Sequence, residues 1–405
     1  MNLDLPPPTL VAEAAGLERL LADLEGAREV AIDTEADSFF NFREKVCLVQ
    51  ITAGERDWLV DPLARIDLSP LGKVLADSQV TKVFHDGEYD ILILKRDFGF
   101  EFKNLFDTRV AAAALGIESP GLAAVLHARF GIELDKSLQR SNWSARPLSQ
   151  QQIRYARLDT HFLLPLMREQ KAELAQRQRT MIVDGECLRL EKLVPAEQTF
   201  SADEFVRLKG ARMLDRDAQQ RLRELFVLRH ELAEQSDLPP FKVIGNDALL
   251  AVAQAAPRNE RDLAQVPGFS VKQARRLGDR VLDALERAEK LGPLERTPNP
   301  PAKDGTSVLN EEEFELHEAL KDWRKGRAVR EGFDASLVIN RHVLLRLAQR
   351  KPATQSELLG IDGLLEWQVA AFGDDITAVV RRAREQFGAD PGPRARRRGF
   401  RPRAG

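Results

Sequence analysis

Two acidic residues separated by one position follow a short apolar run near the N-terminus. Asp33 and Glu35 come directly after the apolar residues 30–32. On a strand, residues two positions apart point to the same face, so these carboxylates would lie side by side. Like charges at the end of a buried strand repel and are poorly solvated unless a cation neutralises them. The pattern favours a cation site, although an acidic surface loop would also produce it.

Two further acidic residues lie in segments that the sequence predicts to be helical. Asp90 stands in the first turns of a helix expected over residues 88–98. An acid there also fits simple complementarity with the helix dipole. Asp159 follows Tyr155 by four residues on a long helix expected over residues 149–177, so the two side chains lie on one face. A core tyrosine beside a solvent-facing aspartate is the alternative for that pair.

The four carboxylates form one chemically coherent set. Hard oxygen ligands suit Mg²⁺ or Mn²⁺ rather than zinc. Two such ions ~3.5 to 4 Å apart can activate a water on one side of a phosphodiester and stabilise the leaving oxygen on the other. A tyrosine hydroxyl nearby can orient the attacking water. The set therefore indicates metal-dependent phosphodiester hydrolysis, provided that the fold brings the four acids together.

Alternating strand and helix patterns occupy the part of the chain that carries these acids. The apolar runs predict strands over residues 28–32, 45–52, 57–61 and 81–84. Helical patterns cover residues 69–77, 88–98, 107–115, 122–130 and 149–177. Three successive strands followed by alternating helices and strands predict an α/β domain with a mixed sheet flanked by helices.

Beyond about residue 200 the sequence pattern becomes helical and repeats itself at an offset of 95 residues. Gly268 matches Gly363, and Pro257 matches Pro352. A proline-rich stretch between the copies, residues 292–306, is typical of a linker. Two copies are too few for a solenoid, so we expect a duplicated small all-α domain.

Composition restricts the class of protein. The 405 residues are 43% hydrophobic and carry a net charge of −3, which suits two or three folded domains. No stretch is long and apolar enough for a membrane span, and the N-terminus lacks a secretory pattern. The two cysteines, Cys47 and Cys187, show no metal or disulfide spacing, so we expect a cytoplasmic protein. Residues 391–405 hold six arginines and no acid, which suits either a solubilising tail or contact with a phosphate backbone.

The ordered set of motifs carries a family resemblance. The motifs stand as Asp33-Thr34-Glu35, His85-Asp86-Gly87-Glu88-Tyr89-Asp90 and Tyr155-Ala156-Arg157-Leu158-Asp159, with Asn142-Trp143-Ser144-Ala145-Arg146-Pro147-Leu148-Ser149 before the last. Over nearly its whole length the chain resembles the ribonuclease D family, within the DEDD superfamily of 3′→5′ exonucleases. The resemblance implies a ribonuclease H-like exonuclease domain followed by two HRDC domains, the helical modules shared with RecQ-type helicases.

The domain limits that we expect combine this resemblance with the composition. They are an exonuclease domain over residues 1–200, HRDC domains over 212–292 and 310–388, a linker over 293–309 and a basic disordered tail over 389–405. The second copy has Asp334-Ala335 where the first has Pro239-Pro240, which puts its contact with nucleic acid in question.

The resemblance also implies a role for each site residue. Asp33 would bridge two divalent metal ions, Mg²⁺ or Mn²⁺, and Glu35 and Asp159 would complete the ion on the nucleophile side. Asp90 would hold the other ion through water, and Tyr155 would position the hydrolytic water. Asp86 and Glu88 are expected to be peripheral acids.

Two histidines and a segment rich in polar and aromatic side chains lie near these motifs. Either histidine could act as a general base or a metal ligand, but we expect His85 and His161 to be structural or to support the ligands. Four residues before the long helix could contact RNA by phosphate pairing and stacking, or could belong to an ordinary surface loop. They are Lys136, Arg140, Trp143 and Arg146.

The function expected from these features is 3′→5′ exoribonuclease activity in tRNA 3′ processing. The products would be nucleoside 5′-monophosphates, and the partner would be RNA, chiefly tRNA precursors, bound by a monomer without an obligate protein partner or a membrane. An exonuclease acting on single-stranded DNA, and a catalytically inactive RNA-binding scaffold, are the alternatives.

Overall fold

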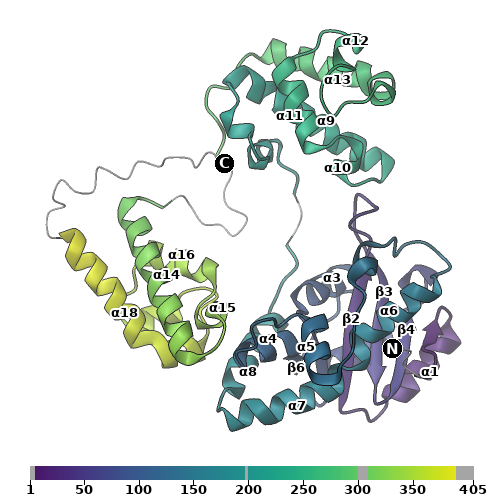
Figure 1. Cartoon of the computed structure of the whole chain (residues 1–405), viewed down its shortest axis with the longest axis vertical. Helices are drawn as coiled ribbons and strands as arrows, with labels where there is room; N and C mark the ends of the chain where they lie inside the picture. The colour runs from purple at the N-terminus through teal and green to yellow at the C-terminus, as the bar shows by residue number, and fades with distance from the viewer. Residues whose placement is uncertain (1–4, 197–198, 300–308, 389–405) are drawn as a thin grey trace.

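The computed structural model describes residues 5–196, 199–299 and 309–388 of the chain (Figure 1). The basic tail predicted over residues 389–405 and most of the predicted linker lie outside the described residues. Within the described ranges, no helix combines the length and apolar content needed to cross a bilayer.

A six-stranded mixed sheet forms the centre of the N-terminal part. Its strands are β1 Thr9–Val11, β2 Glu29–Ala36, β3 Val46–Ala53, β4 Arg56–Val60, β5 Thr81–Phe84 and β6 Leu105–Asp107. The strand order is β1-β4-β3-β2-β5-β6, with β2, β3 and β4 antiparallel and the other neighbours parallel. The predicted meander and mixed sheet are therefore confirmed, and three-residue β1 and β6 are strands that the sequence patterns missed.

Eight α-helices accompany this sheet. They are α1 Ala14–Leu24, α2 Ser69–Ala76, α3 Glu88–Phe98, α4 Thr108–Ala114, α5 Leu122–Phe130, α6 Gln150–His161, α7 Leu163–Gln176 and α8 Thr180–Glu191. Helix α6 packs across β2, β3 and β4, and α7 contacts β2 and β5. Both helices therefore contact β2, the strand that carries the Asp33 and Glu35 pair.

The prediction of one long helix over residues 149–177 is wrong, because the chain turns between α6 and α7. Phe162 leaves the helical region with φ −97° and ψ 0°. Pro165, the third residue of α7, has no N–H with which to bond the carbonyl of His161, and its ring crowds that carbonyl. The proline therefore separates α6 and α7.

The remaining helices form two repeats with matching elements. The first repeat comprises α9 Arg216–Ser236, α10 Pro240–Val243, α11 Asn246–Ala255, α12 Glu260–Leu263 and α13 Val271–Leu291. The second comprises α14 Glu311–Glu331, α15 Ala335–Val338, α16 Arg341–Arg350, α17 Gln355–Leu359 and α18 Glu366–Gly388. Each helix of the second repeat begins 95 residues after its counterpart, which confirms the duplicated all-α domain.

The two repeats relate differently to the sheet domain. The first has a hydrophobic core of its own, whereas the buried side chains of the second are continuous with the core of the sheet domain. At that junction the Arg179 guanidinium donates to the carbonyls of Ala114 (2.7 Å) and Glu331. Gly185 lies so close to Trp367 that a Cβ would stand 2.3 Å from the indole. The second repeat is thus an integral part of the sheet domain's packing.

Gly116 tests this junction. It has φ +79°, and a Cβ there would lie 2.4 Å from the carbonyl oxygen of Gly332. Gly99 is a matched control, since it has φ +67° and no described heavy atom lies within 4 Å of a built Cβ. We expect both alanine variants to lose about 1 kcal/mol from the left-handed backbone. Gly116→Ala should lose substantially more and should increase hydrogen exchange in α8 and α18.

Thermal unfolding and hydrogen-exchange mass spectrometry of the two variants would measure these effects. Equal losses, with unchanged exchange in α18, would show that the second repeat does not depend on this close approach.

Candidate active site

Asp33 and Glu35 lie within β2 rather than after it. The strand continues to Ala36 and pairs Asp33 with Gln50 and Glu35 with Leu48 on β3. Because the residues are two apart on one strand, both carboxylates point to the same face. The predicted side-by-side arrangement is therefore present, in the middle of the sheet.

Asp159 completes a compact oxygen cluster with these two residues. One carboxylate oxygen from each of Asp33, Glu35 and Asp159 lies within 4.8 Å of the other two. Asp159 is only 6% exposed, and its Oδ2 atom is buried with no hydrogen-bond partner in the described parts of the chain. A buried anionic oxygen without a donor is costly, and a cation would satisfy it. The donor set and this unpartnered atom fit a hard divalent ion.

Asp90 is the member of the second motif that faces inward. It is 7% exposed and accepts hydrogen bonds from the Thr34 backbone N–H (3.1 Å) and hydroxyl (2.5 Å), between the two acids of β2. Asp86 and Glu88 instead form ion pairs with Arg109 (3.4 Å) and Arg189 (2.8 Å). The side chains of Asp86 and Glu88 are both exposed, as expected of peripheral acids.

The turn that leads into α3 has a support that sequence reasoning missed. The buried carboxylate of Asp107 accepts the backbone N–H groups of Asp86 (3.1 Å) and Gly87 (2.8 Å) while capping α4. A Cβ at Gly87 would lie 2.5 Å from Cβ of Phe84, so only glycine fits. An Asp that begins a predicted helix was the available signal for Asp107. Together these contacts set where α3 begins, and so where Asp90 stands in its first turn.

Burial raises the pKa of every acid of the site, and repulsion from other site carboxylates adds to the rise for Asp33, Glu35 and Asp159. Burial, followed by repulsion from Asp159 and Asp90, raises the pKa of Glu35 to about 9. Burial raises the pKa of Asp159 to about 8 and that of Asp90 to about 6, although hydrogen bonds to each partly oppose the rise. Burial and three carboxylate neighbours raise the pKa of Asp33 well above its ordinary value. At neutral pH without cations, these shifts favour the protonated forms of Glu35 and Asp159.

Tyr155 lies on α6 one turn before Asp159 and faces it. Its hydroxyl makes a hydrogen bond that lowers the Asp159 pKa, and the side chain of Gln139 reaches the same hydroxyl. Burial raises the pKa of Tyr155, so the hydroxyl stays protonated and can donate. Beside it lies a groove of about 520 Å³ between residues 131–138 and α6. A bound strand could therefore approach the tyrosine from this groove.

Neither histidine joins the cluster of acids. His85 Nδ1 lies 2.9 Å from the Thr108 hydroxyl, and burial lowers the pKa of this imidazole to about 4. His161 Nδ1 lies 2.8 Å from the buried carboxylate of Asp57, which also holds Arg157. These contacts agree with the supporting roles expected for both residues.

Trp143 and Arg146, two of the four residues for which RNA contact and an ordinary loop were both open, pack within the protein. Trp143 is 0% exposed and packs against Tyr155, with ring centroids 6.0 Å apart. Arg146 forms a two-pronged ion pair with Asp61 at 2.6 and 2.7 Å. Of the two interpretations that the sequence left open, an ordinary packed loop describes these two side chains, because both hold the segment before α6 against the sheet. Arg140 is exposed, and the side chain of Lys136 lies outside the described residues.

Comparisons with known proteins agree with this geometry. A family model described as "3′-5′ exonuclease" matches residues 8–175, and the HRDC domain model matches residues 218–285 and 313–380. Ribonuclease D from Zymomonas mobilis is 32% identical over 71% of this chain and 74% of its own length. Ribonuclease D from Haemophilus influenzae is 32% identical over 65% of this chain and 66% of its own.

A solved structure extends the similarity to the whole fold. Escherichia coli RNase D superposes with a TM-score of 0.68, covering 93% of this chain and 99% of that one at 24% identity. The mixed sheet and both helical repeats therefore have the same overall arrangement as in that structure.

The shifted pKa values predict how the metal-free protein responds to pH. Unfolded carboxyl groups titrate near 4, whereas folded Glu35 and Asp159 titrate near 9 and 8. Between these values the folded state binds protons that the unfolded state releases, so stability must fall as the pH rises. In EDTA, the melting temperature should therefore fall between pH 5 and pH 9. Asp159→Asn should weaken this dependence, because an amide neither titrates nor repels its neighbours.

Differential scanning fluorimetry of both proteins checks this prediction, and Mn²⁺ adds a second readout. The ion should raise the melting temperature of the wild type more at pH 8 than at pH 5.5, and should do so much less in Asp159→Asn. Parallel pH profiles for the two proteins would mean that the cluster is not the source of the dependence.

Proposed function

The chain belongs to the ribonuclease D family of 3′→5′ exoribonucleases, and on that premise we propose that it shortens RNA with two divalent metal ions held by four carboxylates. The proposed ligands are Asp33, Glu35, Asp90 and Asp159. The observation that carries the proposal is the close cluster of carboxylate oxygens from Asp33, Glu35 and Asp159, with an Asp159 oxygen that has no partner among the described residues. Mg²⁺ and Mn²⁺ both suit this donor set.

Each residue of the site would have a distinct role. Asp33 would lie between the two ions, Glu35 and Asp159 would complete the ion on the side of the attacking water, and Asp90 would hold the other through water. When bound, such ions activate the water and stabilise the leaving oxygen. Tyr155, whose hydroxyl faces Asp159, would orient the water.

We further propose that the substrates are tRNA precursors with 3′ extensions and that the products are nucleoside 5′-monophosphates. We also propose that the enzyme acts as a monomer in the cytoplasm. Both cysteines, Cys47 and Cys187, are buried and free, which suits a reducing compartment.

Removing one of the proposed ligands should abolish hydrolysis. Asp33→Ala and Asp159→Ala should lower the rate on a precursor tRNA with a 3′ tail by about 10³-fold or more, the scale of a lost transition-state stabiliser. RNA affinity measured in EDTA should change little, because without ions these acids do not attract phosphates. Glu88→Ala is the matched control, since this nearby acid faces away and pairs with Arg189.

Gel analysis with and without Mg²⁺ would follow stepwise shortening, and chromatography would identify the mononucleotide product. If Glu88→Ala lost activity while Asp90→Ala kept it, the assignment of Asp90 would be wrong.

Tyr155→Phe separates water positioning from metal binding. We expect kcat to fall about 10²-fold, the lower range for a group that handles a reacting proton, with little change in KM. Stabilisation by Mn²⁺ should persist, because the four carboxylates remain. A normal kcat in this variant would remove Tyr155 from the mechanism.

Two other functions are compatible with the same cluster. An exonuclease acting on single-stranded DNA differs only in recognition of the 2′-hydroxyl, so rates on matched RNA and DNA oligonucleotides decide between them. An inactive RNA-binding scaffold would bind RNA in EDTA and leave its length unchanged in Mg²⁺.

A further inference from the structure

Gln50 lies in the middle of β3 and carries a buried amide that is not hydrogen-bonded. Its side chain is 0% exposed, and neither Nε2 nor Oε1 has a partner among the residues that the structure describes. Buried amides are nearly always paired, because an unpaired donor or acceptor away from water is costly. The reason for a polar residue at this position must therefore lie in what surrounds it.

The pairing of β2 with β3 places Gln50 directly beside the proposed site. Gln50 is the cross-strand partner of Asp33 in the antiparallel ladder. Directly opposite residues in such a ladder share one face of the sheet, with Cβ atoms about 4.5 to 5.5 Å apart. Glu35, two residues along β2, lies on that face as well. The amide of Gln50 thus starts from the same face as both acids of β2.

Helix α6 covers this face, and the next polar groups along the strand are already paired. The hydroxyl oxygens of Thr52 on β3 and Thr160 on α6 lie 2.8 Å apart, and the Thr52 hydroxyl donates to the buried carboxylate of Asp57 at 2.8 Å. Asp159, whose Oδ2 atom is unpartnered, precedes Thr160 on the helix. Gln50 therefore lies under the helix that brings Asp159 to the cluster.

The side of Gln50 that faces β4 is apolar. Leu59 is its cross-strand partner there and is 1% exposed. Leu59 belongs with Ala156 of α6 to one buried hydrophobic cluster. The amide can therefore find an acceptor only in the direction of β2, where Asp33 stands.

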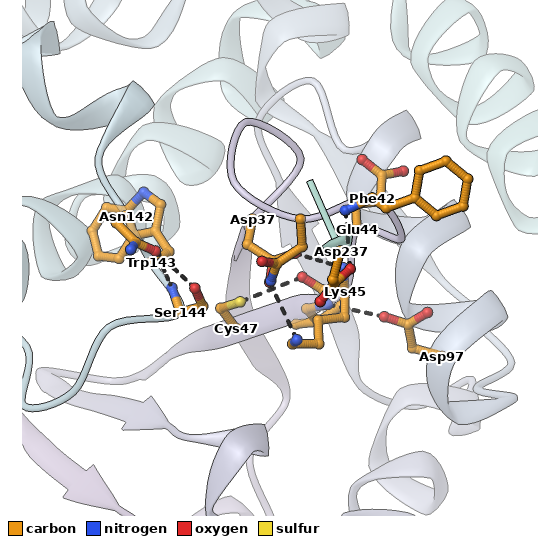
Figure 2. Close-up of polar contacts among 12 residues, drawn as sticks. Asp37, Phe42, Glu44, Lys45, Cys47, Asp97, Asn142, Trp143, Ser144 and Asp237 are labelled. Carbon is orange, nitrogen blue, oxygen red and sulfur yellow. Dashed lines mark hydrogen bonds and ion pairs between the residues drawn. The ribbon is translucent and has the colours of Figure 1, made fainter. Parts of the chain in front are cut away.

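The backbone of β3 is fixed where the strand begins (Figure 2). The Val46 N–H donates to the carboxylate of Asp97 at 2.9 Å. The fully buried carboxylate of Asp37 accepts the Lys45 N–H at 2.9 Å. Since the strand is anchored at this end and paired on both edges, Gln50 can change its contacts only by rotating its own side chain.

We propose that Gln50 is a positioning residue for the metal ions, whose amide N–H donates to the Asp33 carboxylate when ions are bound. Carboxylates that ligate an ion are usually hydrogen-bonded in turn, and such bonds fix which oxygen faces the ion. A neutral amide suits this task, because a lysine would repel the ions and a further acid would add to the repulsion within the cluster. The inference rests on the proposed function, since it concerns ions held by the four carboxylates.

An amide that is paired only in the ion-bound protein has an unusual signature. Gln50→Met keeps a similar shape and removes a buried polar group that is unpaired without ions, so the melting temperature in EDTA should stay the same or rise. Mn²⁺ affinity, measured by isothermal titration calorimetry, should fall about 10- to 100-fold, the range for losing a group that supports a metal ligand. Gln50→Leu should give the same two results.

Gln170→Met is the matched control. Gln170 on α7 is also 0% exposed, but its amide donates to the Thr108 carbonyl at 2.9 Å. Losing that bond should lower the melting temperature in EDTA and leave the Mn²⁺ affinity unchanged. If both Gln50 variants bound Mn²⁺ as the wild type does, or lost stability in EDTA as Gln170→Met does, the positioning role would be overturned.

Activity on RNA gives an independent readout. Gln50→Met should need about 10- to 100-fold more Mg²⁺ for half of its maximal rate, with an unchanged KM for RNA at saturating Mg²⁺. A raised KM with a normal Mg²⁺ requirement would contradict the inference, because it would indicate a contact with RNA instead. A wild type that neither binds Mn²⁺ nor shortens RNA would overturn the proposed function, whereas a wild type that does both leaves the Gln50 variants to decide this inference alone.

Discussion

Repulsion among buried carboxylates is the constraint on which the arrangement of the sheet domain depends. The acids come from β2, α3 and α6, and burial raises each pKa while the neighbours raise most of them further. Such a cluster opposes folding unless the surrounding elements hold it or cations neutralise it. Two hydrogen bonds from Thr34 to Asp90 hold it, as does the Asp107 carboxylate behind the turn into α3.

The parts of the site that could be predicted from the sequence are those fixed by local geometry. Residue spacing alone placed Asp33 beside Glu35 and Tyr155 beside Asp159, because strand and helix periodicity fix local geometry. The approach of Asp90 to the β2 pair could not be derived this way, since it depends on how distant segments pack. Only the family resemblance singled out Asp90 over its acidic neighbours, whereas the structure shows the cause: those neighbours are exposed and pair with arginines.

The errors of prediction also have physical causes. The break between α6 and α7 was visible as Pro165, but a helix-like apolar pattern continues through it. For Trp143 and Arg146 the sequence left RNA contact and loop packing both open, and only burial and the ion pair with Asp61 decide for packing. Residue type thus predicts what a side chain can bind, whereas packing decides whether a ligand can reach it.

Duplication of the helical module illustrates the same principle. Asp237 and Gly332 occupy equivalent left-handed positions at the end of a long helix, 95 residues apart, and both turns meet the sheet domain. In the second copy that turn packs tightly against the end of α4. The Gly332 carbonyl oxygen there leaves no room for a side chain at Gly116. In the first copy an aspartate binds the hairpin that extends from the catalytic strand. One copy therefore stabilises the domain, and the other contacts the connection that follows the catalytic strand.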